Sequence, residues 1–327
     1  MQVLVTGATG FIGSHLVPAL LARGWSVCCL ARITSRKPKE FEQQVRWVEG
    51  DLLNPGSLIK AAREIDAVIH LAGAIKASNP ETFTKVNVTG TENLIEALLL
   101  SGSSSPTLVL ISSQAAQGPS PSRLPLPESA SAQPISCYGW SKLRAEEVVL
   151  KHKDQLPWVI LRPCTVYGPG DRESLAFFKM AKYHLNPIIG WRAVYLNLVY
   201  VTDLVNVIIR VLEKDRSRGE IFNVTDDRDT YPLKEVISTA AQSLGTWTIP
   251  ILLPKWLLRT AVAVNGLLEM ITRRPSMLNS DKYHEMTAQY WSSSAEKIRL
   301  TLNYEPEYDI CKGFQITADW YQEHGWL

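Results

Sequence analysis

The sequence predicts an α/β fold with a doubly wound parallel sheet, followed by a smaller, mainly helical C-terminal lobe. Two observations predict it: short apolar runs alternate with helical patterns through the first half of the chain, and a glycine-rich turn joins the first run to the first helix. Strands separated by helices imply right-handed crossovers and a buried parallel sheet. The 327 residues, 46% of them hydrophobic, can bury the core that such a fold needs.

Strands and helices are expected in alternation up to about residue 163. The expected strands are 3–6, 27–31, 45–50, 67–71, 108–112 and 158–161, and the expected helices are 11–23, 58–63, 80–100 and 138–152. The pattern then weakens, and it predicts helices at 173–183 and 202–213, strands at 195–201 and 221–224, and mainly helices beyond. We therefore expect a sheet domain over residues 1–165 and a second lobe over residues 166–327, which is interleaved with the last sheet strands.

Charge and cysteine content favour a small-molecule ligand. The chain has 34 Lys and Arg against 32 Asp and Glu, so nothing in the balance demands a nucleic acid as partner. The five cysteines form no C-x-x-C pair and no Cys/His cluster, so we expect no metal site and interpret them as reduced packing residues. A strand that starts beside Met1 leaves no room for a signal sequence, which predicts a cytoplasmic protein.

The most apolar late stretch, residues 249–271, is interrupted by Lys255, Arg259 and Glu269. No uninterrupted apolar run in it approaches the ~20 residues of a spanning helix, so no membrane span is expected. Two interpretations stay open: a core helix of the second lobe, or a helix that covers the substrate or faces lipid in a peripheral membrane contact.

Residues 118–136 contain five prolines and several serines. This segment is too long and too rich in proline for a plain turn. We expect an ordered loop over the C-terminal edge of the sheet, where ligands bind in such folds.

The glycine-rich turn has the spacing G-x-x-G-x-x-G between the first strand and the first helix. Gly7 allows a sharp turn, Gly10 lets backbone N–H groups approach a pyrophosphate, and Gly13 lets the helix pack close to the strand. Phe11 and Ile12 begin the helix, whose N-terminus has a partial positive charge. The turn predicts a Rossmann-type dinucleotide site in the sheet domain, with the second lobe binding the substrate.

The end of the second strand bears on which dinucleotide binds. An NAD site usually has an acidic residue there that accepts from the ribose 2′-OH, but this chain has Arg32, with Arg36 and Lys37 close behind. Arg32 could bind a 2′-phosphate, which favours NADP over NAD. The alternative is a solvated basic loop.

Two further strand ends border the predicted nucleotide site. Asp51 could accept from the adenine amino group while Leu52 packs on the ring, or Asp51 could cap the next helix. Ala72 and Gly73 follow the fourth strand, where small residues let backbone pass beside the dinucleotide. His70, at the end of that strand, is interpreted as a packed core histidine.

Tyr138 and Lys142 have the i, i+4 spacing that places two side chains on one face of a helix. A nearby ammonium is expected to lower the pKa of a phenol from its usual value near 10, which would make Tyr138 a tuned acid/base. Ser112 and Ser113 end the fifth strand, where a hydroxyl could hold a substrate oxygen beside the tyrosine.

In this order, the motifs resemble those of the extended short-chain dehydrogenase/reductase superfamily, in its NAD-dependent epimerase/dehydratase group. The motifs are TGATGFIG, HLAG, NVTGT, LISS, YGWSK and RPCTVYGP, together with the chain's ending at 320–327. The resemblance implies that Ser113 orients the substrate, Tyr138 is the acid/base, Lys142 binds the ribose, Asn87 lies near the proton relay and Pro163 lies beside the nicotinamide. It implies hydride transfer with NADP or NAD as cofactor, and homodimers are usual in similar proteins.

The branch of the family decides the substrate class. Nucleotide-sugar enzymes of this group typically have an arginine where this chain has Leu196, and a second in the C-terminal lobe, for which Arg273 and Arg274 are the candidates. The apolar stretch 256–268 is more like that of 3β-hydroxysteroid dehydrogenases and dihydroflavonol reductases. A hydrophobic hydroxyl or ketone substrate is therefore preferred, and a nucleotide-sugar epimerase or dehydratase is the alternative.

Overall fold

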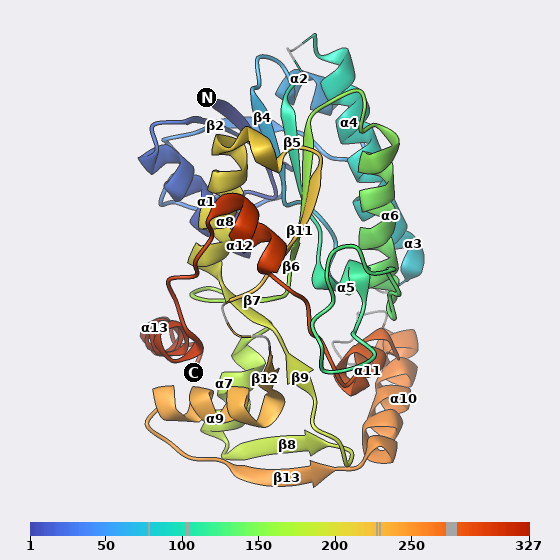
Figure 1. Cartoon of the computed structure of the whole chain (residues 1–327), viewed down its shortest axis with the longest axis vertical. Coiled ribbons are helices and arrows are strands. Elements are labelled where there is room, and N and C mark those ends of the chain that lie inside the picture. The colour runs from blue at the N-terminus through green and yellow to red at the C-terminus, as the bar shows by residue number, and fades with distance from the viewer. Residues whose placement is uncertain (78, 103–104, 227, 229, 273–279) are drawn as a thin grey trace.

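A seven-stranded, wholly parallel sheet forms the centre of the larger part of the molecule (Figure 1). The structure is a computed structural model that describes all residues except 78, 103–104, 227, 229 and 273–279. The strand order is β11-β6-β5-β4-β1-β2-β3. The strands are β1 (Gln2–Thr6), β2 (Ser26–Ala31), β3 (Arg46–Glu49), β4 (Ala67–His70), β5 (Thr107–Ile111), β6 (Trp158–Pro163) and β11 (Glu220–Val224).

The strand order explains where a ligand can bind. The chain moves from β1 towards β3, then returns to β4 on the other side of β1 and continues towards β6. The two directions diverge between β1 and β4, so the loops after these strands leave a crevice at the carboxyl edge of the sheet, as in dinucleotide-binding folds. The expected doubly wound fold is confirmed.

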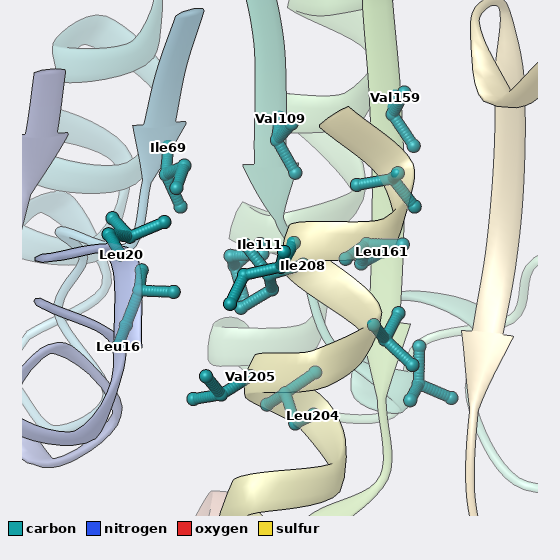
Figure 2. Close-up of a cluster of buried hydrophobic side chains, with 14 of the residues drawn as sticks. Leu16, Leu20, Ile69, Val109, Ile111, Val159, Leu161, Leu204, Val205 and Ile208 are labelled. Atoms are coloured by element: carbon teal, nitrogen blue, oxygen red, sulfur yellow. The ribbon is translucent and has the colours of Figure 1, made fainter. Parts of the chain in front are cut away.

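Helices cover both faces of the sheet, so that it forms the middle of three layers. One face packs against α1 (Phe11–Ala22), α8 (Val201–Glu213) and α12 (Glu296–Leu302). Figure 2 shows this packing, with Leu204, Val205 and Ile208 of α8 beside Ile111 and Leu161 of the sheet. The other face packs against α2 (Pro55–Ala61), α4 (Gly90–Leu100) and α6 (Cys137–Lys151).

A second lobe has its own core of aromatic side chains, including Tyr167, Phe178, Phe314 and Tyr321. Its helices are α7 (Leu175–Lys182), α9 (Leu233–Ser243) and α13 (Ile310–Glu323). It also contains three two-stranded sheets that the sequence pattern predicted only in part. They pair β7 (Thr165–Tyr167) with β10 (Leu198–Tyr200), β9 (Tyr195–Leu196) with β12 (Tyr231–Pro232), and β8 (Leu185–Ile189) with β13 (Ile249–Leu253).

The remaining helices connect or flank these parts. They are α3 (Pro80–Phe83), α5 (Gln114–Gln117), α10 (Lys255–Thr272) and α11 (Ser280–Thr287), with a π-helical segment at Thr84–Thr89 and a short 3₁₀ helix at Asp215–Ser217. The expected single helix over 80–100 is therefore α3, the π-helical segment and α4 in succession. The proline-rich segment 118–136 is an ordered loop, which is fixed by backbone bonds such as those from Ser120 to Tyr290 and from Leu126 to Ser292.

Residues 249–271 do not form one core helix. Pro254 separates β13 from α10, and most side chains of the described part of α10 are exposed, with Trp256 67% accessible. The core-helix interpretation is wrong for residues 255–265, because most of their side chains are exposed and no described layer of the second lobe covers them. No helix among the described residues is long and apolar enough to span a bilayer.

The cysteines have free thiols. Cys28, Cys29 and Cys164 are buried, as expected for packing residues, whereas Cys311 is exposed on α13 and does not pack in the core.

Candidate active site

The glycine-rich turn after β1 is a close-packed piece of backbone. Gly7 has a φ of +76°, and an added Cβ would lie 2.7 Å from the backbone nitrogen of Ala72. At Gly13, a Cβ would lie 2.4 Å from the carbonyl oxygen of Gly7. Both positions exclude larger residues, the first because of its left-handed conformation as well as its neighbours.

The turn presents the start of α1 to the crevice. Gly10 is the N-cap residue and has no side chain to bond the first turn, which begins with Phe11 and Ile12 and contains no acidic residue. The N–H groups of a first helical turn have no partner within the helix, and the helix dipole adds partial positive charge. This bare N-terminus, bordered by glycines, fits the pyrophosphate of a dinucleotide.

The basic and acidic residues expected around the nucleotide lie at the ends of β2 and β3. Arg32 is exposed directly after β2, with Arg36 and Lys37 in the following loop. The Oδ1 atom of Asp51 accepts from the backbone of Leu53, whereas α2 is capped by Asn54. The alternative of Asp51 as the cap of α2 is therefore wrong. The Leu52 side chain is 8% exposed and packs in the core.

A chain of hydrogen bonds runs from the strand ends to Asn87. The backbone N–H of Ala72 donates to Thr6 Oγ1 over 3.2 Å, and Thr6 Oγ1 lies 2.7 Å from Nδ1 of His70. On the other side of the ring, Nε2 of His70 lies 3.1 Å from Oγ1 of Thr91, whose hydroxyl donates to the carbonyl oxygen of Asn87 over 2.6 Å. Because the Thr91 proton is committed to Asn87, Nε2 must donate and Nδ1 must accept.

This arrangement requires a neutral imidazole. Burial lowers the pKa of His70 to about 3, and the positive charge of Lys142 adds to the lowering. His70 is 1% exposed and is the packed core histidine that the sequence indicated.

Asn87 lies in the π-helical segment Thr84–Thr89, an irregular helix turn of a kind often found at functional sites. Its side chain accepts from the backbone N–H of Ala74 over 2.7 Å and donates to the Ala74 carbonyl over 3.0 Å and to Ser141 Oγ over 2.8 Å. An added Cβ at Gly73 would lie 3.1 Å from Asn87 Oδ1. Asn87 thus links the loop after β4 to helix α6.

Helix α6 presents Tyr138 and Lys142 to the carboxyl end of β5. The helix begins at Cys137 because Ser136 Oγ accepts from the N–H of Gly139 over 3.1 Å. Lys142 is 6% exposed and donates from Nζ to the carbonyl oxygen of Ile111 over 2.6 Å. Burial lowers its pKa to about 8, against the attraction of Glu146.

The electrostatics of Tyr138 differ from the expectation. Loss of contact with water raises the pKa of Tyr138 to about 12; a hydrogen bond with Ser113 opposes the rise and the negative charge of Glu285 adds to it. The predicted lowering by Lys142 is not found: burial is the largest influence on the pKa of Tyr138, and the ammonium of Lys142 donates to the carbonyl oxygen of Ile111. The phenol is therefore held in its protonated form at neutral pH.

The two serines at the end of β5 have different surroundings. Ser112 Oγ donates to Glu146, a buried carboxylate that also forms an ion pair with Arg162 at 2.6 Å. Ser113 is the N-cap of α5; its Oγ accepts from the N–H of Ala115 over 3.1 Å, and its hydroxyl opposes the rise in the pKa of Tyr138. Only Ser113 of the pair therefore faces the tyrosine.

Several residues around this site carried no sequence motif. In α11, Asp281 Oδ2 accepts from the backbone N–H of Cys137 over 2.7 Å, and Glu285 acts on the pKa of Tyr138. The buried Asn197 accepts from Gln114 over 3.0 Å and from the N–H of Ser293 over 2.6 Å. These contacts join segments far apart in the chain, so only the tertiary structure reveals them.

The remaining predicted positions lie farther along the sheet and in the second lobe. Pro163 is buried at the end of β6, where it pairs with Val224 of β11. Leu196 lies in β9, where it pairs with Tyr231. Arg273 and Arg274 lie outside the described residues.

Comparisons with known proteins agree with this geometry. Residues 3–225 match the model of the NAD dependent epimerase/dehydratase family. The chain is 31% identical to a ceramide reductase of Caulobacter vibrioides, over 99% of this chain and 96% of that protein. It is 25% identical to a decarboxylating sterol-4-alpha-carboxylate 3-dehydrogenase of Candida albicans, over 98% of each chain.

The fold also matches solved structures along nearly its whole length. A UDP-glucose 4-epimerase of Thermotoga maritima, solved with UDP-glucose, superposes with a TM-score of 0.80 at 23% identity and covers 99% of both chains. The match of the family model over more than half of the chain, together with the full-length relative above 30% identity, shows the family. The chain belongs to the NAD dependent epimerase/dehydratase family and is an NAD(P)-dependent enzyme of the extended short-chain dehydrogenase/reductase superfamily.

Proposed function

We propose that this protein is a reductase or dehydrogenase that prefers NADP(H) and interconverts a ketone and a hydroxyl group on a hydrophobic substrate. The observation that carries the proposal is the placement of Ser113, Tyr138 and Lys142 at the carboxyl end of β5, in the sheet whose glycine turn fits a dinucleotide. Nucleotide binding is assigned to residues 1–165 and substrate binding to residues 166–327.

The cofactor supplies or accepts the hydride, and side chains of this protein hold the substrate and transfer the proton. Ser113 holds the substrate carbonyl oxygen by donating its hydroxyl proton. Tyr138, whose pKa burial raises to about 12, is protonated at neutral pH and would give its proton to that oxygen in a reduction. Lys142, held by its hydrogen bond to Ile111, binds the ribose of the cofactor. In oxidation the same transfers run in reverse.

The proposed cofactor contacts come from four strand ends and from α6. They are Gly7, Gly10, Phe11, Ile12, Gly13, Arg32, Asp51, Leu52, Ala72, Gly73, Asn87, Tyr138, Lys142 and Pro163. The exposed Arg32, at the place where an acidic residue would accept from a 2′-OH, supports the preference for NADP.

The substrate class rests on two observations. Half-buried Leu196 provides no charge for a substrate diphosphate at the position where nucleotide-sugar enzymes typically have arginine. The ceramide reductase and the sterol dehydrogenase that resemble this chain are named for hydrophobic substrates. Both favour a lipid-like ketone or alcohol over a nucleotide sugar.

The test is oxidation of NADPH in the presence of steroid ketones or long-chain aliphatic ketones, compared with turnover of UDP-glucose. We expect ketone-dependent oxidation, and we expect Tyr138→Phe to abolish it while NADPH still binds, because the phenyl ring keeps the shape but has no proton to give. Epimerisation of UDP-glucose without net cofactor consumption, or full activity of the Tyr138→Phe variant, would contradict the proposal.

The cofactor preference has a separate test. We expect higher kcat/KM with NADPH than with NADH, and we expect Arg32→Ala to raise KM for NADPH roughly tenfold, since a hydrogen bond to a charged group contributes about 1.5–3 kcal/mol. KM for NADH should change little. A clear preference of the unmodified protein for NADH would overturn the assignment.

A further inference from the structure

The second lobe ends in an apolar surface that no element among the described residues covers. We call it the β13–α10 surface. Its exposed side chains include Trp191, Trp247, Ile249, Ile251, Trp256 and Leu257. Trp191 is 88% exposed and Trp256 is 67% exposed. Large apolar side chains grouped in this way mark an interaction site more often than an ordinary surface.

The segments that carry these side chains are neighbours in space. Strand β13 pairs with β8 from Ile249 opposite Leu185 to Leu253 opposite Ile189, and the turn after β8 continues to Trp191. The side chain of Lys255, at the start of α10, lies against Gly190 in that turn, where an added Cβ would be 3.1 Å from its Cε atom. Figure 1 shows β8, β13 and α10 together at the end of the molecule farthest from α2.

The charged side chains of this surface are all basic. Residues 182–194 and 244–265, which form it, contain no Asp or Glu. They contain four exposed basic residues: Lys182, Arg192, Lys255 and Arg259. A partner that covers this surface must therefore accept apolar side chains and carry negative charge at its rim.

We propose that the β13–α10 surface binds the headgroup region of an anionic lipid bilayer. Tryptophan is enriched at the boundary between headgroups and acyl chains because its ring is both apolar and able to donate a hydrogen bond. Lysine and arginine beside it gain from the negative surface potential of anionic lipids. A second copy of the same basic surface is less favoured, because like charges would face each other across the contact.

The bilayer would then lie close to the candidate active site. Helix α10 packs on α11, and Asp281 of α11 bonds to the N–H of Cys137, the residue before Tyr138. The proposal does not depend on the substrate, since it rests on the surface alone. If the substrate is a membrane lipid, binding through this surface brings the second lobe to the bilayer that contains that lipid.

The experiment is co-sedimentation of the full-length protein with vesicles of phosphatidylcholine alone and of phosphatidylcholine mixed with phosphatidylglycerol. No substrate is added, so failure of this test leaves the reductase proposal untouched. We expect binding to the anionic vesicles that weakens when salt is raised to about 0.5 M. Two variants test the surface: Lys255→Gln/Arg259→Gln removes charge, and Ile251→Ser/Trp256→Ser removes apolar contact.

The expected loss of affinity is roughly thirty-fold for the charge variant, from about 1 kcal/mol for each basic residue, and at least about tenfold for the apolar variant. Matched controls lie elsewhere on the surface: Lys60→Gln/Arg63→Gln at α2 and Leu100→Ser/Leu300→Ser at α4 and α12, all at exposed positions. These should bind like the unmodified protein. NADPH binding and the thermal midpoint of every variant check that it is folded.

Three outcomes would overturn the proposal. The first is no binding to anionic vesicles, and the second is binding that the surface variants and the controls reduce equally. The third is a dimer in sedimentation velocity that Ile251→Ser/Trp256→Ser dissociates while vesicle binding is unchanged, which would make the surface an interface between copies of the chain.

Discussion

Ser112 and Ser113 are adjacent, yet their hydroxyl groups lie in different surroundings. The chain leaves β5 between them, so Ser112 remains with the buried pair of Glu146 and Arg162 while Ser113 caps α5 beside Tyr138. Sequence alone offered both serines as partners of the tyrosine, and a family resemblance selected one. The different surroundings of the two hydroxyl groups support that choice, which stays a prediction.

We predict that Ser113→Ala lowers kcat, whereas Ser112→Ala lowers stability. Ser113→Ala should lower kcat by roughly 10²-fold, the scale of losing one hydrogen-bond donor to a reacting oxygen, with little change in stability. Ser112→Ala should leave kcat nearly unchanged but lower the free energy of unfolding by about 1–3 kcal/mol, since Glu146 loses a buried donor. Steady-state kinetics and urea unfolding measure the two effects, and an exchange of the two patterns would contradict the assignment of roles.

The buried, neutral state of His70 leads to a prediction about how the free energy of unfolding depends on pH. Its pKa is about 3 in the folded chain and near 6.5 in the unfolded chain, so the unfolded chain binds more protons between these values. The stability from a neutral His70 is therefore fully present above pH 6.5 and is lost as the pH falls towards 3. We expect a contribution of about 1.4 kcal/mol per pH unit well inside this window.

The comparison that isolates His70 is with His70→Gln, which cannot take up a proton. This variant should be less stable at pH 7, because the bonds to Thr6 and Thr91 are disturbed. Its free energy of unfolding, measured in urea from pH 7 to pH 4.5, should fall less steeply than that of the unmodified chain. Parallel curves would show that His70 is not held neutral.

At the scale of elements, the close approach of α5 and α6 positions Tyr138. A Cβ at Gly139 would lie 2.4 Å from the carbonyl oxygen of Ala115, a backbone atom that cannot move away easily. Gly139→Ala should therefore push the start of α6 outward and shift Tyr138 from Ser113. We expect a loss of about 1–3 kcal/mol in stability and at least a tenfold loss in kcat/KM.

Gly56→Ala is the matched control, because its Cβ would meet only Asn54 Oδ1, at 3.6 Å. In the first turn of α2 the alanine should leave activity unchanged and alter stability by no more than about 1 kcal/mol, in the favourable direction. Thermal unfolding and turnover of both variants provide the comparison. If Gly139→Ala behaves like Gly56→Ala, the tight contact does not position the tyrosine.

The prediction of helices and strands was most accurate where apolar runs alternate regularly with helical patterns. All six strands expected before residue 163 are present: five are apolar runs buried between two helical layers, and the edge strand β3 is only half-buried. The pattern missed β7, β8, β12 and β13, which are short or contain proline: Asn186 and Pro187 interrupt β8, and Pro250 interrupts β13. It also read α3, the π-helical segment and α4 as one regular helix, because side-chain periodicity does not report a local change of backbone hydrogen bonding.

At the scale of the whole molecule, α11 connects the second lobe to α6. Asp281 accepts from the N–H of Cys137 at the N-terminus of α6, where a carboxylate also interacts favourably with the helix dipole. Apart from Tyr138 and Lys142 of α6, the proposed contacts of the dinucleotide lie outside the helix that Asp281 holds. We therefore expect Asp281→Ala to disturb substrate binding without disturbing NADPH binding.

The expected result for Asp281→Ala is a KM for the ketone raised roughly tenfold, the scale of losing a hydrogen bond to a charged group, with faster amide exchange in α11. The dissociation constant of NADPH should be unchanged. Asp281→Asn keeps an acceptor oxygen in the same place and should restore most of the affinity. Equal defects in the Asn and Ala variants would show that the hydrogen bond does not hold the lobes together.

The sequence by itself determined the doubly wound sheet, the glycine turn and the order of the serines, the tyrosine and the lysine, because each depends on contacts or spacings within a short stretch of chain. The tertiary structure decided which serine faces Tyr138, that its pKa rises instead of falling, and that residues 249–265 form an open surface instead of a core helix. Burial, desolvation and partner choice depend on which distant segments pack together, and a local pattern of residues does not contain that information.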